Sequence, residues 1–185
     1  MKRHSLAKIF CLAALGTALT VAATNAADEI KPAEVTKAIA ILMPTEGNDV
    51  KGTVSFIKTA DGVKVEGKIT GLTPGKHGFH IHEFGDLSSP DGKSLGGHFN
   101  PEGHQHGGLD AKMRHAGDFG NIEADDQGVA TVDFVDKAIS LSGENSILGR
   151  GVVVHAKADD LKSQPSGDAG ARVAVASIGV AAGKE

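Results

Sequence analysis

A histidine-dense segment, from His77 to Asp118, holds most of the residues in this chain that could do chemistry. Seven of the nine histidines lie in this segment, and only His4 and His155 lie elsewhere. Neutral imidazole is the commonest metal ligand among protein side chains. The segment therefore predicts a metal-binding region, and the spacing of its histidines indicates which metals it suits.

His80 and His82 are separated by one residue, and apolar Phe79 and Ile81 alternate with them. In a β-strand such residues share one face, so both imidazoles project together while the apolar pair enters the core. By itself this pair is a weak signal, because surface strands carry such pairs by chance. His155 ends a valine-rich run and adds a third strand-borne imidazole. An all-imidazole group of this kind favours copper among the common metals.

A second group follows in the same segment, where His98, His106, His115 and Asp118 are eight, nine and three residues apart. Three imidazoles and one carboxylate form a closed tetrahedral set that suits zinc, and the carboxylate adds the negative charge that imidazoles lack. Four protein ligands leave no position for a reactive water. The set therefore disfavours a zinc hydrolase.

Alternating apolar and polar residues predict several short β-strands to position these side chains, with turn signals such as Asp61-Gly62 between them. No window of useful length shows the helical period. This pattern favours an all-β fold, an antiparallel sandwich or barrel. Two segments interrupt it, residues 83–117 and 156–171, and long loops in a compact domain are usually functional or disordered. The strand-like runs cover residues 38–42, 53–56, 63–70, 130–134, 151–155 and 172–180.

The first 26 residues have the pattern of a secretory signal, with Lys2, Arg3 and Lys8 ahead of an apolar run over residues 9–23. That run is short for a membrane span. We therefore predict export to the periplasm or the extracellular space. Residues 27–36 are expected to be an exposed leader, and residues 37–185 a single domain.

Removal of such a signal changes both the cysteine content and the charge of the chain. The only cysteine, Cys11, lies within it, so the 159 residues from Ala27 onward can form no disulfide. That length suits one domain with a substantial core. The net charge moves from −4 to −7, with 16 basic against 23 acidic residues. We therefore expect neither nucleic-acid binding nor stable membrane association.

Six motifs in order carry a family resemblance: HGFHIHEFGD, GGHFNP, HGG, RHAGDFGN, ILGRGVVVHAKADDL and GDAGARVA. Together they closely resemble the copper/zinc superoxide dismutases, over roughly residues 36–181. The resemblance implies an eight-stranded antiparallel Greek-key barrel with two long functional loops. It also implies copper and zinc as cofactors.

The resemblance assigns a role to each candidate side chain. Asp159 matches a carboxylate that links a copper-bound to a zinc-bound histidine, and such partners fix ring orientation. Arg172 matches a guanidinium beside the open copper face, which attracts and orients the substrate anion. His77 is expected to be a structural hydrogen-bonding residue and His104 a solvated loop residue. The implied copper ligands are His80, His82, His98 and His155, the implied zinc ligands are His98, His106, His115 and Asp118, and the implied apolar plugs of the barrel ends are Leu72 and Leu141.

The implied reaction is dismutation of superoxide to dioxygen and hydrogen peroxide, with Arg172 and His98 as the catalytic residues. By resemblance, His98 would bridge the two metals, leave copper(I) and take up a proton. The alternative is an exported copper- and zinc-binding protein, a buffer or carrier without turnover. Because the chain keeps every implied ligand and Arg172, the sequence favours the enzyme.

The chain departs from the family pattern in its loops. The family ties the first loop to the last strand by a disulfide, whereas this loop has no cysteine and the strand carries Val175. A native disulfide in a small domain is worth ~2–5 kcal/mol, so we expect dimerisation and zinc to hold the loop instead. The second loop is short and leaves Lys157 and Lys162 as nearby steering charges. The resemblance implies a homodimer through Ile39, Ile41, Gly85, Leu148, Gly149, Ile178 and Val180.

Overall fold

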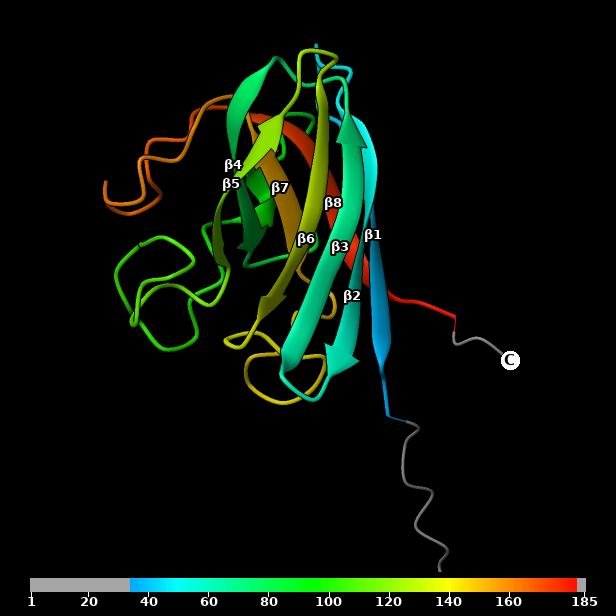
Figure 1. Cartoon of the computed structure of the whole chain (residues 1–185), viewed down its shortest axis with the longest axis vertical. Coiled ribbons are helices and arrows are strands. Elements are labelled where there is room, and N and C mark those ends of the chain that lie inside the picture. Colours follow the sequence, from blue (N-terminus) through cyan, green and yellow to red (C-terminus); the bar gives the residue numbers. More distant parts are fainter. Residues whose placement is uncertain (1–33, 183–185) are drawn as a thin grey trace, which may run out of the picture. The chain divides into compact units, whose positions relative to one another are not determined.

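The computed structural model describes residues 34–182, which form a closed antiparallel barrel (Figure 1). The predicted signal and most of the predicted leader lie outside the described residues. Within the described part, no helix is long and apolar enough to cross a membrane. The strands are β1 (Lys37–Pro44), β2 (Lys51–Thr59), β3 (Gly62–Thr70), β4 (Gly75–His82), β5 (Asp118–Ala124), β6 (Val129–Asp136), β7 (Gly151–His155) and β8 (Arg172–Val180), and one helical turn, η1, spans Lys93–Leu95.

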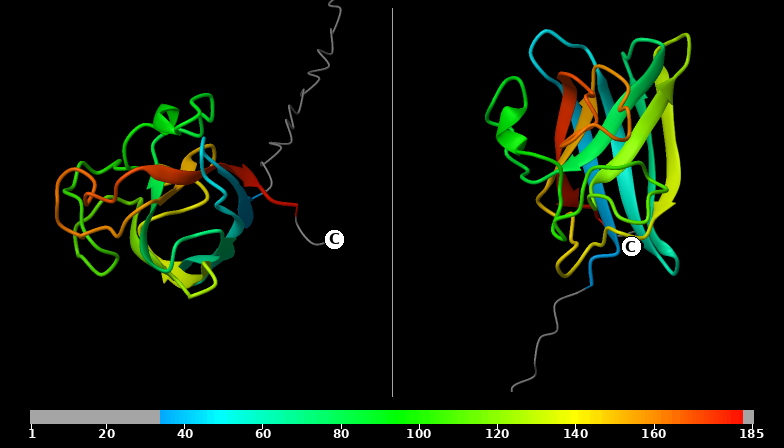
Figure 2. Two further views of the ribbon diagram at one scale, coloured as in Figure 1. Left: turned by 90° about the horizontal axis from the view of Figure 1, so that it is seen from above. Right: turned by 90° about the vertical axis from the view of Figure 1, so that its left-hand side faces the viewer.

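The strands close into a ring in the order β1-β2-β3-β6-β5-β4-β7-β8, which the left view of Figure 2 shows end-on. Three neighbouring pairs, β3 with β6, β4 with β7 and β1 with β8, join strands that are not consecutive in the chain. These crossovers give the Greek-key connectivity. The expected all-β, eight-stranded antiparallel barrel is therefore confirmed.

Side-chain alternation explains why each strand buries one face in the barrel. In β1, Ala38, Ala40 and Leu42 are buried, whereas Ile41 is 56% exposed. Leu72 and Leu141, in the connections after β3 and β6, are both buried in the same core. The predicted inward set of β1 and the two predicted plug residues are therefore core residues.

Ile178 is a correction to the predicted dimer contacts. Its side chain is only 2% exposed and belongs to the barrel core. The period of two along β8 requires this, since the neighbouring Ser177 and Gly179 point outward and are exposed. Ile178 therefore stabilises the protomer and cannot form part of a contact surface.

Strand β5 gave no alternation signal in the sequence. Gly120 and Asn121 interrupt it, and Gly120 has a φ of 74°, a backbone conformation that favours glycine. The strand forms through its partner, since residues 121–124 of β5 pair with residues 75–78 of β4. Tertiary pairing therefore decides the conformation here, where local propensity is weak.

The two predicted loops, residues 83–117 and 156–171, leave the barrel on the same side and lie next to each other (Figures 1 and 2). Hydrogen bonds join them, since the Gln164 side chain bonds to the backbone of His106. Apart from the single turn η1, both segments lack regular secondary structure. The expectation of two long loops is confirmed.

The first loop is held against the barrel wall by an apolar cluster. Leu95 from the loop, Val153 from β7 and Val175 from β8 are buried together, and Leu87 packs at their edge. A Cβ on Gly92 would lie 2.7 Å from Val175, so the loop backbone passes directly over this strand. Sequence reasoning named dimerisation and zinc as the elements that hold the loop. The structure adds this contact within the protomer, at Val175, the residue that takes the place of the cysteine implied by the resemblance.

Candidate metal centre

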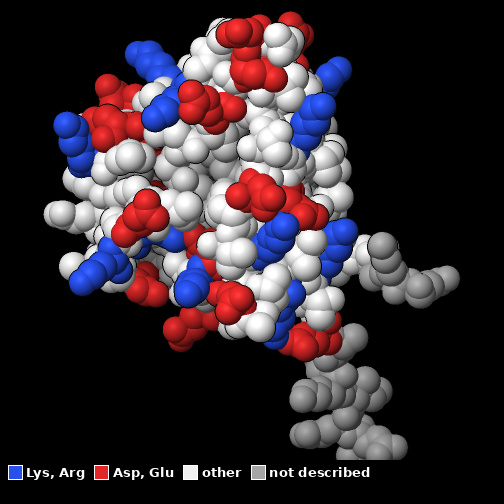
Figure 3. Space-filling model, in the orientation of Figure 1, with Lys and Arg blue, Asp and Glu red and all other residues white. Residues whose placement is uncertain are grey.

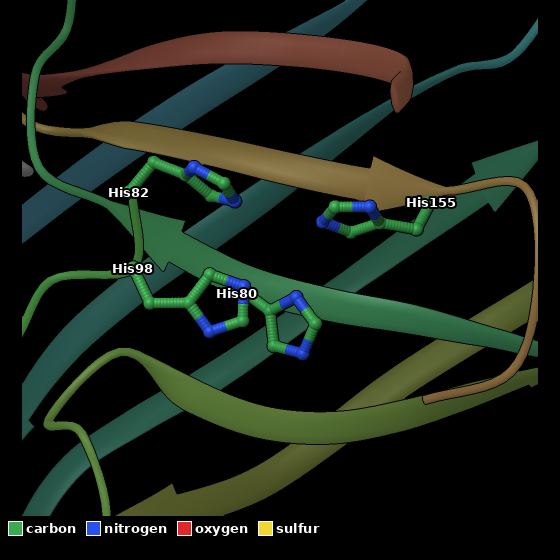
Figure 4. Close-up of side chains that lie close together, drawn as sticks. All are labelled: His80, His82, His98 and His155. Carbon is green, nitrogen blue, oxygen red and sulfur yellow. The ribbon is translucent and has the colours of Figure 1, made fainter. Parts of the chain in front are cut away.

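Four imidazoles converge on the outside of the barrel wall between β4 and β7 (Figure 4). His80 and His82 come from β4, His155 from the end of β7, and His98 from the loop beside them. One ring nitrogen of each lies within 4.8 Å of the others. This group, the copper set below, contains the four residues that the sequence predicted.

The backbone of β4 explains this convergence. Phe79 and Ile81 are fully buried in the core, so His80 and His82 face the opposite side. Phe99 donates its backbone N–H to the carbonyl of Ile81, which places His98 opposite His82. The register of β4 also shifts between Gly78 and His80, and such irregularities re-aim side chains beside functional sites.

Each strand-borne ring of the copper set uses one nitrogen for a hydrogen bond and leaves the other without a partner. His80 Nε2 donates to Asp159 Oδ2 at 2.8 Å, and the Nδ1 atoms of His82 and His155 donate to backbone carbonyls at 3.0 and 3.1 Å. Within residues 34–182 the remaining nitrogens, His80 Nδ1 and the Nε2 atoms of His82, His98 and His155, are buried without hydrogen bonds. Buried polar atoms without partners are costly. Four of them around one point fit a metal ion that accepts imidazole nitrogen.

The zinc set, consisting of His98, His106, His115 and Asp118, also comes together. The Nδ1 atoms of the three histidines lie 2.7, 3.0 and 3.2 Å from Asp118 Oδ1. Ligands at about 2.0 Å around a tetrahedral zinc would be about 3.3 Å apart. The other carboxylate oxygen accepts the backbone N–H groups of Gly107 and His115, so Oδ1 is held toward the histidines. The donor types and their spacing fit zinc.

His98 is the one residue that belongs to both sets. Its Nδ1 lies 2.7 Å from Asp118 Oδ1 in the zinc set, whereas its Nε2 is one of the buried nitrogens of the copper set. The ring is almost completely buried, with 2% of its side chain exposed. A single imidazole therefore faces both sites, as a bridging ligand must.

Asp159 connects the two sets from behind. Its Oδ2 accepts from His80 and its Oδ1 from His106, at 2.8 and 2.9 Å. The Asn121 side chain fixes the backbone of Asp159 by donating to its carbonyl and accepting from its N–H, at 2.9 and 2.8 Å. Asp159 therefore bonds to one histidine of each set, and Asn121 is a supporting residue that sequence reasoning missed.

Burial controls protonation in the copper set. It lowers the pKa of His80 to about 4 and that of His155 to about 3, and it holds the pKa of His82 well below 6.5. These imidazoles are therefore neutral at pH 7, which is the form that binds metal.

Protonation differs in the zinc set, because two carboxylates, Asp118 of the set and Asp159 behind it, lie against His106. Burial acts to lower the pKa of His106, but Asp118 and Asp159 outweigh it and raise that pKa to about 9. Burial acts to raise the pKa of both carboxyls, but hydrogen bonds from His106 keep each well below its usual range. In the absence of metal this set therefore carries a proton that zinc must displace.

Arg172 lies half-buried in a cleft of about 410 Å³ whose rim includes Asp91 and Lys93. Its guanidinium donates to the backbone carbonyls of Gly92 and Gly96, and the Gly96 carbonyl also accepts from His82 Nδ1. Burial lowers the pKa of Arg172, but a guanidinium remains charged in proteins. The site therefore has one fixed positive charge next to the copper set.

The structure also places the predicted residues that belong to neither donor set. His77 is buried, and its two ring nitrogens lie 2.8 and 2.9 Å from the backbone carbonyls of His155 and Thr73, so its structural role is confirmed. His104 is partly exposed, and its Nδ1 lies 3.2 Å from the Arg114 carbonyl. Lys157 and Lys162 are exposed on the second loop.

Comparisons with known proteins agree with this site. The model of the family "Copper/zinc superoxide dismutase (SODC)" matches residues 50–178. The chain belongs to the copper/zinc superoxide dismutase family. Over 155 residues it is 50% identical to "Superoxide dismutase [Cu-Zn] 2" from Mesembryanthemum crystallinum, a match that covers 80% of this chain and 97% of the relative.

Two further proteins are similar to this chain, one relative and one solved structure. "Superoxide dismutase [Cu-Zn]" from Paramecium bursaria Chlorella virus 1 is 48% identical over 155 residues, with 80% of this chain and 81% of the relative covered. A solved structure of the clock protein EA4 is 46% identical, has a TM-score of 0.73, and is matched over 79% of this chain and 95% of its own. The donor sets of the chain and its membership of this family agree on copper and zinc as the cofactors.

Proposed function

We propose that this protein dismutes superoxide, so that two anions and two protons give dioxygen and hydrogen peroxide. The supporting observation is that both donor sets are complete and share His98, with Arg172 held beside them. Copper would supply the one-electron exchange with superoxide, and zinc would supply charge and fixed geometry. The protein provides the position of these groups and the path of the proton.

His80, His82, His98 and His155 would hold copper, and His98, His106, His115 and Asp118 would hold zinc. Asp159 keeps the rings of His80 and His106 oriented through one carboxylate oxygen each. Arg172 would attract and orient the anion with its fixed charge at the cleft. His98 Nε2, buried and without a hydrogen-bond partner among the described residues, is placed to take up and release the proton that the product requires.

The test is a superoxide-decay assay on protein reconstituted with copper and zinc, with metal content measured on the same sample. We expect turnover that is lost when copper is removed. Full metal loading without superoxide-dependent turnover would contradict the proposal and favour the exported metal-binding protein without turnover.

We further propose that the protein is exported to the periplasm or the extracellular space. This rests on the positive start, the apolar run over residues 9–23 and the small residues Thr24 and Ala26. The mass of the protein purified from the host should correspond to a chain that starts near Ala27. Cytoplasmic protein that retains residues 1–26 would contradict export.

We also propose a homodimer. The proposed contact surface consists of exposed apolar side chains on β1, β8 and the neighbouring turns, and Phe84, which sequence reasoning did not name, joins it. Gly85 and Gly149 bring two of these turns within touching distance, since a Cβ on Gly85 would lie 2.4 Å from the Gly149 carbonyl oxygen. Exposed apolar patches on soluble proteins often mark interfaces. Among these side chains, Ile41 is 56%, Met43 51%, Phe84 51% and Val180 62% exposed.

A further inference from the structure

The short second loop contacts the zinc set through a side chain that the proposed function does not use. The Gln164 amide accepts the backbone N–H of His106 at 2.8 Å and donates to the backbone carbonyl of the same residue at 3.0 Å. The two residues are 58 positions apart in the chain. One side chain thus clamps both polar backbone groups of a predicted zinc ligand.

These are the only hydrogen bonds that the backbone of His106 makes within residues 34–182. His106 is buried, and buried backbone groups need partners. It lies in an irregular loop, so no strand ladder supplies them. The backbone position of His106 therefore depends on Gln164.

The segment that carries Gln164 is itself well anchored. Asp160 accepts the backbone N–H groups of Lys162 and Ser163, and Ser163 accepts that of Gly167. Gly167 packs directly on the site, since a Cβ there would lie 1.8 Å from Asp159 Oδ1 and 2.6 Å from His106 Nε2. The loop is thus a hydrogen-bonded support that reaches the zinc set.

The same clamp occurs at two other points around the centre. Asn121 binds both backbone groups of Asp159, and Asn100 binds both backbone groups of His104 at 2.9 and 3.0 Å. Among these amides, Gln164 is the one that joins the second loop to a predicted metal ligand. Asp159 fixes the His106 ring from one side, and Gln164 fixes its backbone from the other.

We propose that Gln164 is a positioning residue for zinc, which holds the backbone of His106 so that its Nδ1 faces the other ligands. This rests on the proposed zinc ligation by His106. Groups that orient a metal ligand typically contribute 10–100-fold to metal affinity. Because Gln164 is exposed, the lower end of that range applies.

The test compares Gln164→Met, which keeps the length of the side chain but removes its amide, with the parent protein. Zinc affinity is measured by competition with a chromophoric chelator, and the ligand geometry by the visible spectrum of cobalt(II) bound in place of zinc. We expect about 10-fold weaker zinc binding and an altered cobalt spectrum. Gln164→Ala should give the same result without the longer side chain.

The matched control is Gln105→Met, at the exposed residue next to His106 whose side chain makes no hydrogen bond in the described structure. It should leave zinc affinity and the cobalt spectrum unchanged. Unaltered zinc binding in Gln164→Met would overturn the proposal. So would a fall in melting temperature that is as large in metal-free as in zinc-loaded protein. Absence of superoxide turnover in the parent would contradict the proposed function and leave this result intact.

Discussion

Asp159 joins the two metal sets through a single carboxylate. Each of its two oxygens accepts a hydrogen bond from a different histidine. A carboxylate can accept a hydrogen bond at both oxygens, whereas an amide accepts at one and donates at the other. The hydrogen bonds to His80 and His106, at 2.8 and 2.9 Å, therefore both require the charged acid.

The first prediction concerns Asp159→Asn. The amide NH₂ would face one of the two ring N–H groups, so either His80 or His106 would lose its orientation. We expect the affinity for copper, zinc or both to fall by about 10–100-fold, measured by chelator competition at each site. Asp126→Asn is the control, because Asp126 is exposed in the turn between β5 and β6 and its side chain makes no hydrogen bond within residues 34–182. Unchanged affinity at both sites would contradict the linking role.

Arg172 combines a charge with a structural role, and two substitutions separate them. Arg172→Gln removes the charge, so superoxide turnover should fall by about 10-fold or more and lose its dependence on ionic strength. Arg172→Lys keeps the charge but not the two-pronged donor that binds the Gly92 and Gly96 carbonyls. It should keep the salt dependence while lowering the melting temperature.

The measurement for both Arg172 variants is turnover at several salt concentrations, with copper content determined in parallel. Lys68→Gln, at an exposed residue on β3 across the barrel from β7, serves as the control for a general loss of positive charge. Equal turnover in Arg172→Gln and the parent would exclude an anion-guiding role for this residue.

At the residue scale, spacing and the family resemblance predicted which side chains meet, but not which ring nitrogen of each histidine stays without a hydrogen bond. His82 presents Nε2 because its Nδ1 binds the Gly96 carbonyl, and His155 does so because of Gly170. His80 presents Nδ1 because its Nε2 binds Asp159. These choices depend on groups far away in the sequence, which no local pattern reports.

At the scale of elements, the first loop shows how the barrel holds a segment without a disulfide. Leu95 inserts fully between Val153 and Val175, so the contact is apolar and independent of redox conditions. Arg172 adds hydrogen bonds to the carbonyls on either side of η1. The loop that carries His98 is therefore fixed at several points.

The prediction at this scale concerns Leu95→Ala. Truncation of a fully buried leucine typically costs about 2–5 kcal/mol, and here the cavity would open under the loop. We expect a lower melting temperature and faster proteolysis within residues 83–97, measured by calorimetry and limited digestion. Leu87→Ala, at the partly buried edge of the cluster, should cost less. Equal effects of the two substitutions would show that the cluster does not hold the loop.

The sequence predicted the long loops and most strands because alternation is a local signal. It gave no sign of β5, whose Gly120 and Asn121 depend on pairing with β4. The sequence also did not reveal the hydrogen bonds between Gln164 and the backbone of His106, because two residues 58 positions apart form no local pattern. The Greek-key connectivity came from the family resemblance, because alternation does not specify neighbours.

At the scale of the whole molecule, charge gives little overall attraction for an anion. The net charge is −4, and acidic and basic side chains are interspersed over the face in Figure 3. Beyond about 8 Å, physiological salt screens such surface charges. The field at the cleft is therefore set by nearby groups, namely Arg172, Glu46 and the Asp91–Lys93 pair at 2.6 Å.

The last prediction concerns the proposed dimer. Ile41→Lys and Phe84→Glu each place a charge within the exposed apolar surface, so either should convert a dimer into a monomer in sedimentation experiments at micromolar concentration. Val135→Lys is the matched control, because Val135 is also an exposed apolar residue, at 45%, but lies on β6 away from β1 and β8. It should leave the assembly unchanged.

Dimerisation and zinc binding should both raise the melting temperature, because each selects the folded state by mass action. We therefore expect melting to rise with protein concentration, to fall on addition of a zinc chelator, and to ignore thiol reductants, since residues 27–185 contain no cysteine. The Ile41→Lys variant should lose the concentration dependence but keep the response to chelator. A parent protein that sediments as a monomer, with melting unaffected by zinc removal, would contradict both contributions.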